Sequence, residues 1–328
     1  MRPSKVDEAA LYQHPAYRIG RVAILVALVT ATFWQYVYGF YGNEQVAQAL
    51  ERVVQGIGNK PYIYRCLVPF GVRLLMWLKP LRIDVYVVLV MYLAALGMLF
   101  SFQYLYHTFW KGSVFADLAI LLGISLMFLL IYKEKKIYDL AAMFLFTASL
   151  GLMARGKFVT LAVLYPFACL AKETAIFLIP IFFLYFWARL PRFRWTVILA
   201  YQLLCYGLVR LFLMWYFRAN PGEMFNFYWR WHIEGYAAQP GLVLLYLVGG
   251  GVVMYWVWKN WAKKPRFLRL TASIMFPSLI VLYFVSGMPF EIRVFAEAYP
   301  VVYLLAVYGL VTKVGYTPDP FVASNLAL

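Results

Sequence analysis

The feature that most constrains this chain is a run of about thirty apolar residues, Phe158 to Ala188, interrupted only by the charged pair Lys172-Glu173. An ammonium or a carboxylate costs several kcal/mol at the centre of a lipid bilayer. The pair therefore lies either at a membrane face or against a polar cavity. In both cases it divides the run into two short helices and marks a candidate functional site.

Composition is typical of a polytopic helical membrane protein. Of the 328 residues, 64% are hydrophobic and 13% are charged, a balance that soluble globular domains do not have. The net charge of +16 comes largely from basic residues in short loops between apolar runs. This is the positive-inside pattern of membrane proteins, so we expect membrane lipids and no nucleic acid as partners.

The cysteines and histidines give no sign of a metal or haem site. The three cysteines lie in or beside apolar runs, and neither they nor the three histidines have metal-ligand spacing. We therefore expect neither zinc nor haem, and the residues identify no certain cofactor. A divalent metal ion is the one cofactor left open.

The apolar segments predict an all-α fold in one transmembrane domain, 22–313, with no soluble domain. Eleven segments have helical length, and we expect nine to eleven of them to be transmembrane or re-entrant helices. They fall at about 22–41, 63–80, 83–107, 114–132, 138–153, 158–171, 174–188, 195–217, 241–259, 267–286 and 296–313. Polar tails at 1–21 and 314–328 complete the chain, and no cleavable signal peptide is expected.

Loop charges predict the orientation of these segments. Basic residues before the first helix place the N-terminus in the cytoplasm, and the loops 42–62 and 218–240 then lie outside. The Lys172-Glu173 pair becomes the tip of a hairpin that faces outside. One inconsistency remains, because four segments separate residue 60 from residue 155 where an odd number is required. Either 63–80 or 138–153 must be re-entrant or lie in the membrane interface.

This orientation brings several ionisable groups to one membrane face. They are Glu44, Arg65, Lys172-Glu173, Glu291, Arg293 and Glu297, with Asp139 as a further member. Each has an ordinary explanation: a loop acid, an arginine that extends to lipid headgroups, or a solvated hairpin tip. Together they would supply cations for a phosphate or pyrophosphate and carboxylates for a general base.

Two other motifs have structural explanations. The glycines Gly249-Gly250-Gly251 lie within an apolar segment, so we expect them to allow close helix packing rather than phosphate binding. The stretch Trp229-Arg230-Trp231-His232 is expected to be an aromatic belt at the membrane interface, with a lipid or sugar groove as the alternative.

Three short motifs resemble the multi-spanning GT-C glycosyltransferase superfamily. They are Tyr64-Arg65-Cys66-Leu67-Val68-Pro69, then Tyr138-Asp139-Leu140 followed by Leu170-Ala171-Lys172-Glu173-Thr174-Ala175, and Glu291-Ile292-Arg293 through Glu297 and Pro300. The resemblance implies a GT-C-like bundle that transfers a sugar from a polyprenyl-phosphate donor at the outer face. Members of the superfamily normally carry a catalytic aspartate after the first helix, where this chain has Gly42-Asn43-Glu44.

The resemblance assigns roles to the charged residues. Glu44 is the expected base and Asp139 a second catalytic residue. Substrate binding falls to Arg65, Lys172, Glu173, Glu291, Arg293 and Glu297. The expected location is the bacterial inner membrane.

Two alternatives remain open. The chain could be a non-catalytic GT-C-like subunit of a larger complex, with a membrane-protein partner, or a transporter or flippase for a lipid-linked anion.

Overall fold

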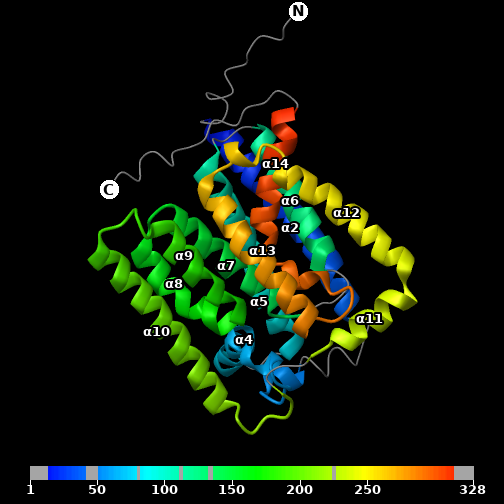
Figure 1. Cartoon of the computed structure of the whole chain (residues 1–328). Coiled ribbons are helices and arrows are strands. Elements are labelled where there is room, and N and C mark those ends of the chain that lie inside the picture. The colour runs from blue at the N-terminus through cyan, green and yellow to red at the C-terminus, as the bar shows by residue number, and fades with distance from the viewer. Residues whose placement is uncertain are drawn as a thin grey trace, which may run out of the picture.

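A computed structural model of the chain describes residues 14–41, 51–79, 82–110, 114–131, 136–223 and 227–313, and these are almost entirely helical (Figure 1). No strand occurs in these ranges. All eleven apolar segments of the sequence are found as helices. Five helices, α2, α5, α10, α12 and α13, are long and apolar enough to cross a membrane. The expected all-α fold is confirmed at this level, and the helices indicate a multi-pass membrane protein.

The main helices are α2 (Pro15–Tyr41), α4 (Leu67–Leu78), α5 (Ile83–Phe109), α6 (Val114–Ile131), α7 (Asp139–Ala154), α8 (Phe158–Ala171), α9 (Leu178–Phe186), α10 (Arg192–Tyr216), α11 (Trp229–Ala238), α12 (Pro240–Trp258), α13 (Arg266–Ser286) and α14 (Tyr299–Lys313). Short 3-10 turns, η1 (Tyr62–Tyr64), η2 (Glu173–Phe177), η3 (Trp261–Lys263) and η4 (Ile292–Phe295), connect some of them. The segment 218–240, expected to be an outer loop, contains helix α11.

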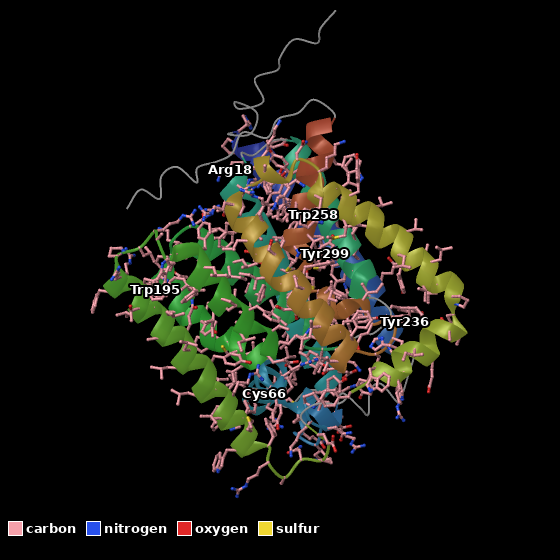
Figure 2. All side chains as sticks on the ribbon, viewed as in Figure 1. Arg18, Cys66, Trp195, Tyr236, Trp258 and Tyr299 are labelled. Atoms are coloured by element: carbon pink, nitrogen blue, oxygen red, sulfur yellow. The ribbon has the colours of Figure 1, made fainter. Side chains whose placement is uncertain are left out.

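The bundle has two chemically different ends. At one end, Arg21 of α2 pairs with Asp117 of α6, and the Arg155 guanidinium donates to Thr108 of α5. We call this the basic end, because twelve basic residues gather there with Asp117 as the one acid among the described residues. The twelve are Arg18, Arg21, Arg155, Lys157, Arg189, Arg192, Arg194, Lys259, Lys263, Lys264, Arg266 and Arg269. Arg18 and Cys66 mark opposite ends in Figure 2.

Helix α4 explains why four apolar segments separate residue 60 from residue 155, where the loop charges require an odd number of passes. It begins beside Arg65, and just after its end the carbonyl of Lys79 accepts a hydrogen bond from the Tyr86 hydroxyl near the start of α5. Twelve residues of helix extend only about 18 Å, so both ends of α4 lie at the end of the bundle opposite the basic end. The helices α5, α6 and α7 then run from end to end, which gives the odd number of passes that the loop charges require.

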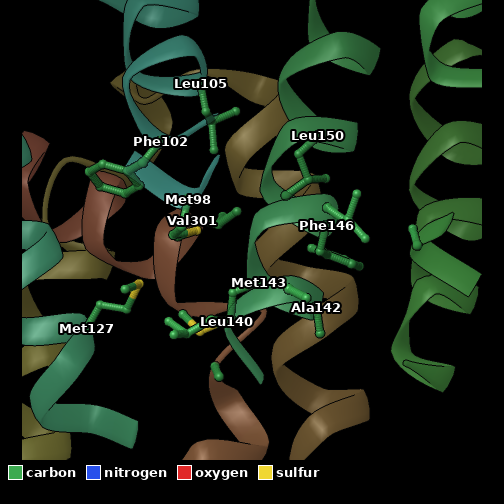
Figure 3. Close-up of a cluster of buried hydrophobic side chains, with 14 of the residues drawn as sticks. Met98, Phe102, Leu105, Met127, Leu140, Ala142, Met143, Phe146, Leu150 and Val301 are labelled. Carbon is green, nitrogen blue, oxygen red and sulfur yellow. The ribbon is translucent and has the colours of Figure 1, made fainter. Parts of the chain in front are cut away.

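The core lies where α5 and α7 pack side by side, with α6 and α14 against them (Figure 3). Its side chains are apolar, and most are fully buried. Those labelled in Figure 3 are Met98, Phe102 and Leu105 of α5, Met127 of α6, Leu140, Ala142, Met143, Phe146 and Leu150 of α7, and Val301 of α14. This packing fixes α7 and α14, which carry part of the charged site at their N-terminal ends.

The glycines of α12 do not have the packing role expected from the sequence. A Cβ atom added at Gly249, Gly250 or Gly251 would meet nothing within 4 Å. The close approach is made instead at Gly309 of α14, where an added Cβ would lie 2.4 Å from the carbonyl oxygen of Trp256. The α12–α14 contact therefore depends on the glycine that the sequence did not single out.

Gly309→Ala is expected to destabilise the protein by about 1–3 kcal/mol, because the new methyl group overlaps the backbone of α12. Gly250→Ala is the matched control: it fills open space and gains up to about 1 kcal/mol of helix propensity. Thermal unfolding of the two variants in detergent measures both effects. Equal midpoints would contradict the packing described here.

Candidate functional site

The charged site begins at a break in the chain between α8 and η2. Lys172 has extended backbone angles, φ −162° and ψ 150°, so the helix stops there and η2 starts at Glu173. The amide of Lys172 still donates to the carbonyl of Ala168, at 3.2 Å, which closes the last turn of α8. The break turns the Lys172 and Glu173 side chains toward segments distant in sequence.

Lys172 bridges two carboxylates deep in the bundle. Its Nζ lies 2.6 Å from Glu297 Oε1, just before α14, and 3.7 Å from Asp139 Oδ1, at the start of α7. Both carboxylates are completely buried, and Lys172 is nearly so. Each acid also lies at or near the N-terminus of a helix, where the helix dipole favours negative charge. Lys172 thereby ties the α8–η2 break to the starts of α7 and α14.

Arg293 of η4 joins the same site from a third direction. Its guanidinium donates to Asp139 Oδ2 at 3.2 Å and lies 2.5 Å from Glu291 Oε1. The other oxygen of Glu291 accepts the backbone amide of Met288, at 2.8 Å. Arg293 is therefore held between two carboxylates, one of which is anchored to its own turn.

Arg65 forms the outer part of the site. Its guanidinium donates two hydrogen bonds to the Glu173 carboxylate, one of 3.1 Å from Nε. It also lies over the ring of Tyr138, 4.7 Å from the centroid, and at 5.2 Å from that of Tyr62, distances at which cation–π attraction operates. The Glu173 side chain is 39% exposed, in contrast to the buried acids behind it.

Neighbouring charges offset the effect of burial on the pKa values of Lys172 and Glu173. Burial alone would lower the pKa of Lys172, but the Glu297 and Asp139 carboxylates outweigh it and leave that pKa raised. Burial would raise the pKa of Glu173, yet the charge and hydrogen bonds of Arg65 lower it to about 2. Opposite charges therefore dominate over desolvation in both groups.

We call the seven charged residues the ion cluster. They are Arg65, Asp139, Lys172, Glu173, Glu291, Arg293 and Glu297. The expectation that these groups come together is met in the geometry, whereas their catalytic and binding roles remain predictions. Glu44, the expected base, lies outside the described residues.

Sequence reasoning missed two neighbours of the cluster. Tyr36 of α2 is buried beside Asp139, Arg293 and the backbone of Lys136. Lys136 itself is exposed, with its Nζ 5.9 Å from the ring centroid of Tyr62. No local pattern distinguishes Tyr36 from the other tyrosines of α2, and a lysine in a short connection between apolar segments, such as Lys136, is ordinary in a membrane protein.

The cluster contains three cations and four carboxylates, and every cation has at least one carboxylate partner. In the described part of the chain, Glu297 Oε2 and the Tyr138 hydroxyl are buried without a hydrogen-bond partner. Each of these two oxygen atoms can therefore form a hydrogen bond with a ligand. No group of three His, Cys, Asp or Glu residues in those ranges is arranged to hold a metal ion. The geometry therefore offers an ionic network with a rim formed by Arg65, Glu173 and Lys136, where Glu173 and Lys136 reach solvent and Arg65 is nearly buried behind Glu173.

Comparisons with protein-family models, curated proteins and solved structures found no match.

Lys172→Met is expected to destabilise the protein by about 3–5 kcal/mol, because it leaves buried carboxylates without their counter-charge. The double variant Lys172→Met with Glu297→Met removes both charges and should recover most of the loss. Arg82→Gln is the control: the Arg82–Asp84 pair is at the surface and should contribute less than about 1 kcal/mol. A Lys172 variant as stable as this control would contradict the bridging role. Thermal unfolding in detergent measures all three.

Proposed function

We propose that the chain is an integral membrane glycosyltransferase with a GT-C-like bundle, which transfers a sugar from a polyprenyl-phosphate donor. The observation that carries the proposal is the gathering of Arg65, Lys172 and Arg293 with four carboxylates at one end of an apolar bundle. Cations near a membrane face suit the phosphate of a lipid-linked donor. The motifs that resemble the superfamily contribute the residues of this cluster.

The charge difference between the two ends supports an orientation. Basic residues mark the cytoplasmic side of membrane proteins, and here they gather at the end where α2 begins. We therefore place the N-terminus in the cytoplasm and the ion cluster toward the outer face, and propose the bacterial inner membrane as the location. The proposed number of crossings is nine to eleven, with α4 in the interface.

Within the cluster, the geometry favours the rim for contact with a donor. Lys172 and Arg293 are buried between carboxylates, so a phosphate reaches them only if these pairs break. Arg65 is held by the partly exposed Glu173, and Lys136 is an exposed cation nearby. We propose that the donor phosphate replaces Glu173 on Arg65, while the inner pairs keep the rim in place. The acceptor base is proposed to be Glu44, with Asp139 in support.

A binding and transfer experiment tests this proposal. The purified protein in nanodiscs is given polyprenyl phosphate, which is shared by donors of different sugars, and then labelled polyprenyl-phosphate sugars. Arg65→Gln should weaken lipid-phosphate binding at least tenfold, while Glu173→Gln should strengthen it because a competing anion is removed. Glu44→Gln should abolish transfer without loss of binding.

Arg82→Gln serves as the control, since it removes an arginine outside the cluster and should change neither readout. Wild-type protein that binds no polyprenyl phosphate would contradict the proposal. Full transfer by Glu44→Gln would remove that residue from the role of base.

A second candidate, a non-catalytic membrane subunit, is favoured by one observation. Every cation of the cluster is already paired within the chain, as in a purely structural network. A stable stoichiometric complex after gentle solubilisation, together with no binding of polyprenyl phosphate, would favour this candidate over the enzyme.

A further inference from the structure

Helix α11 has two chemically distinct faces. His232 is only 2% exposed and faces the bundle, whereas Trp229, Trp231 and Ile233 are each more than half exposed. The helix packs against α12 and α13, at the end that carries the ion cluster (Figure 1). The sequence grouped His232 with its tryptophan neighbours in one aromatic belt, but the structure separates them.

The inner face of α11 is fixed to the end of α13. His232 Nε2 lies 3.0 Å from the carbonyl oxygen of Tyr283 and 2.9 Å from that of Gly287. Carbonyl oxygens only accept hydrogen bonds, so Nε2 carries a proton and donates. The backbone amide of Tyr228 adds a bond to the carbonyl of Val285, at 3.1 Å. α11 therefore holds the last turn of α13.

The same face fixes the tight turn that follows α13. The Tyr236 hydroxyl donates to the Tyr283 hydroxyl, at 2.9 Å, which in turn accepts the amide of Phe290, at 2.8 Å. Phe290 has φ 65°, a left-handed conformation that is strained for a bulky residue. The rings of Tyr236 and Tyr246, with centroids 5.3 and 5.6 Å from that of Phe290, pack around it. The turn keeps its shape because Tyr236 of α11 and Tyr246 of α12 enclose it.

This turn leads directly into the ion cluster. Glu291 follows Phe290, and its carboxylate accepts the amide of Met288 while it pairs with Arg293. Arg293 then reaches Asp139. His232 Nδ1 also lies 2.9 Å from the Tyr236 hydroxyl. Hydrogen bonds from His232 to Phe290, the backbone from Phe290 to Glu291, and the ion pairs of Glu291 and Arg293 therefore join α11 to the buried cluster.

The outer face of α11 suits the headgroup layer of a bilayer. Tryptophans with one apolar and one polar edge concentrate at that depth. The charged residues of the helix, Arg230 and Glu234, balance each other and are both exposed, so attraction to anionic lipids is not needed. The helices that precede and follow α11 in the chain, α10 and α12, are long and apolar enough to span a membrane. A short helix that connects two such helices lies at the membrane surface.

We propose that α11 is an interfacial helix whose outer face binds the zwitterionic headgroup layer, and whose inner face positions the Glu291–Arg293 arm of the ion cluster. His232 and Tyr236 are positioning residues in this scheme. The inference does not depend on the reaction proposed above, because it concerns the depth of α11 and its coupling to the turn.

Spin labels test the depth of α11 in nanodiscs of zwitterionic lipid, in a variant whose three cysteines are replaced by alanine. A label at Ile233→Cys should report the headgroup depth from its relative accessibility to oxygen and to a water-soluble nickel complex. Leu245→Cys on α12 should report the hydrocarbon, and Glu223→Cys should report water. A label at position 233 that matches either control, or moves with added anionic lipid, would overturn the surface assignment.

Hydrogen exchange tests the coupling in the otherwise unmodified protein. His232→Phe keeps a ring but loses all three hydrogen bonds of the imidazole, to the Tyr236 hydroxyl and to the carbonyls of Tyr283 and Gly287, and should speed exchange of the 287–296 amides at least tenfold. Tyr236→Phe removes one hydroxyl group and should speed exchange of the same amides by a smaller factor. This milder variant tests the coupling even if His232→Phe folds poorly. His107→Phe, at the basic end, is the matched control and should leave this segment unchanged. Unchanged exchange in Tyr236→Phe and a folded His232→Phe would overturn the positioning role.

Discussion

The contact on which the structure most depends is the bridge from Lys172 to Glu297 and Asp139. These residues come from three segments far apart in the sequence, and the bridge joins the starts of α7 and α14 to the break after α8. Buried charges are costly unless paired, so each segment has one low-energy position relative to the others. The bridge determines how α7, α14 and the break after α8 are placed relative to one another. The apolar packing of α5, α7 and α14 supplies most of the favourable free energy of folding.

Much of this arrangement could be predicted from the sequence, for a physical reason. Apolar runs of helical length have few alternatives in a membrane, so all eleven segments were found as helices. The gathering of the charged residues at one end was predicted from loop charge alone. Their burial was not: Lys172-Glu173 was expected at an outward-facing hairpin tip, whereas Lys172 is buried against Glu297 and Asp139 and Glu173 pairs with Arg65.

Other features had no local signal. The length of α4 relative to a bilayer left its path open. Its tertiary contacts, among them the hydrogen bond from Tyr86 to the carbonyl of Lys79, place it at one end of the bundle. The packing at Gly309 depends on the backbone of α12, whereas the conspicuous triple glycine faces open space. His232 looked like part of an aromatic belt because two of its partners, the backbone carbonyls of Tyr283 and Gly287, lie more than fifty residues further along the chain. These are tertiary facts that composition and spacing do not encode.

The cluster also limits what any ligand can do at this site. Its inner pairs are closed, because Lys172 and Arg293 each contact two carboxylates and lie almost wholly out of solvent. Only the Arg65–Glu173 pair has a partner that solvent can reach. An incoming anion therefore competes with a single carboxylate at the rim, and a scaffold and an enzyme differ in whether that exchange takes place. The low pKa of Glu173 keeps this competitor charged at neutral pH, so a ligand must carry a strong negative charge to displace it.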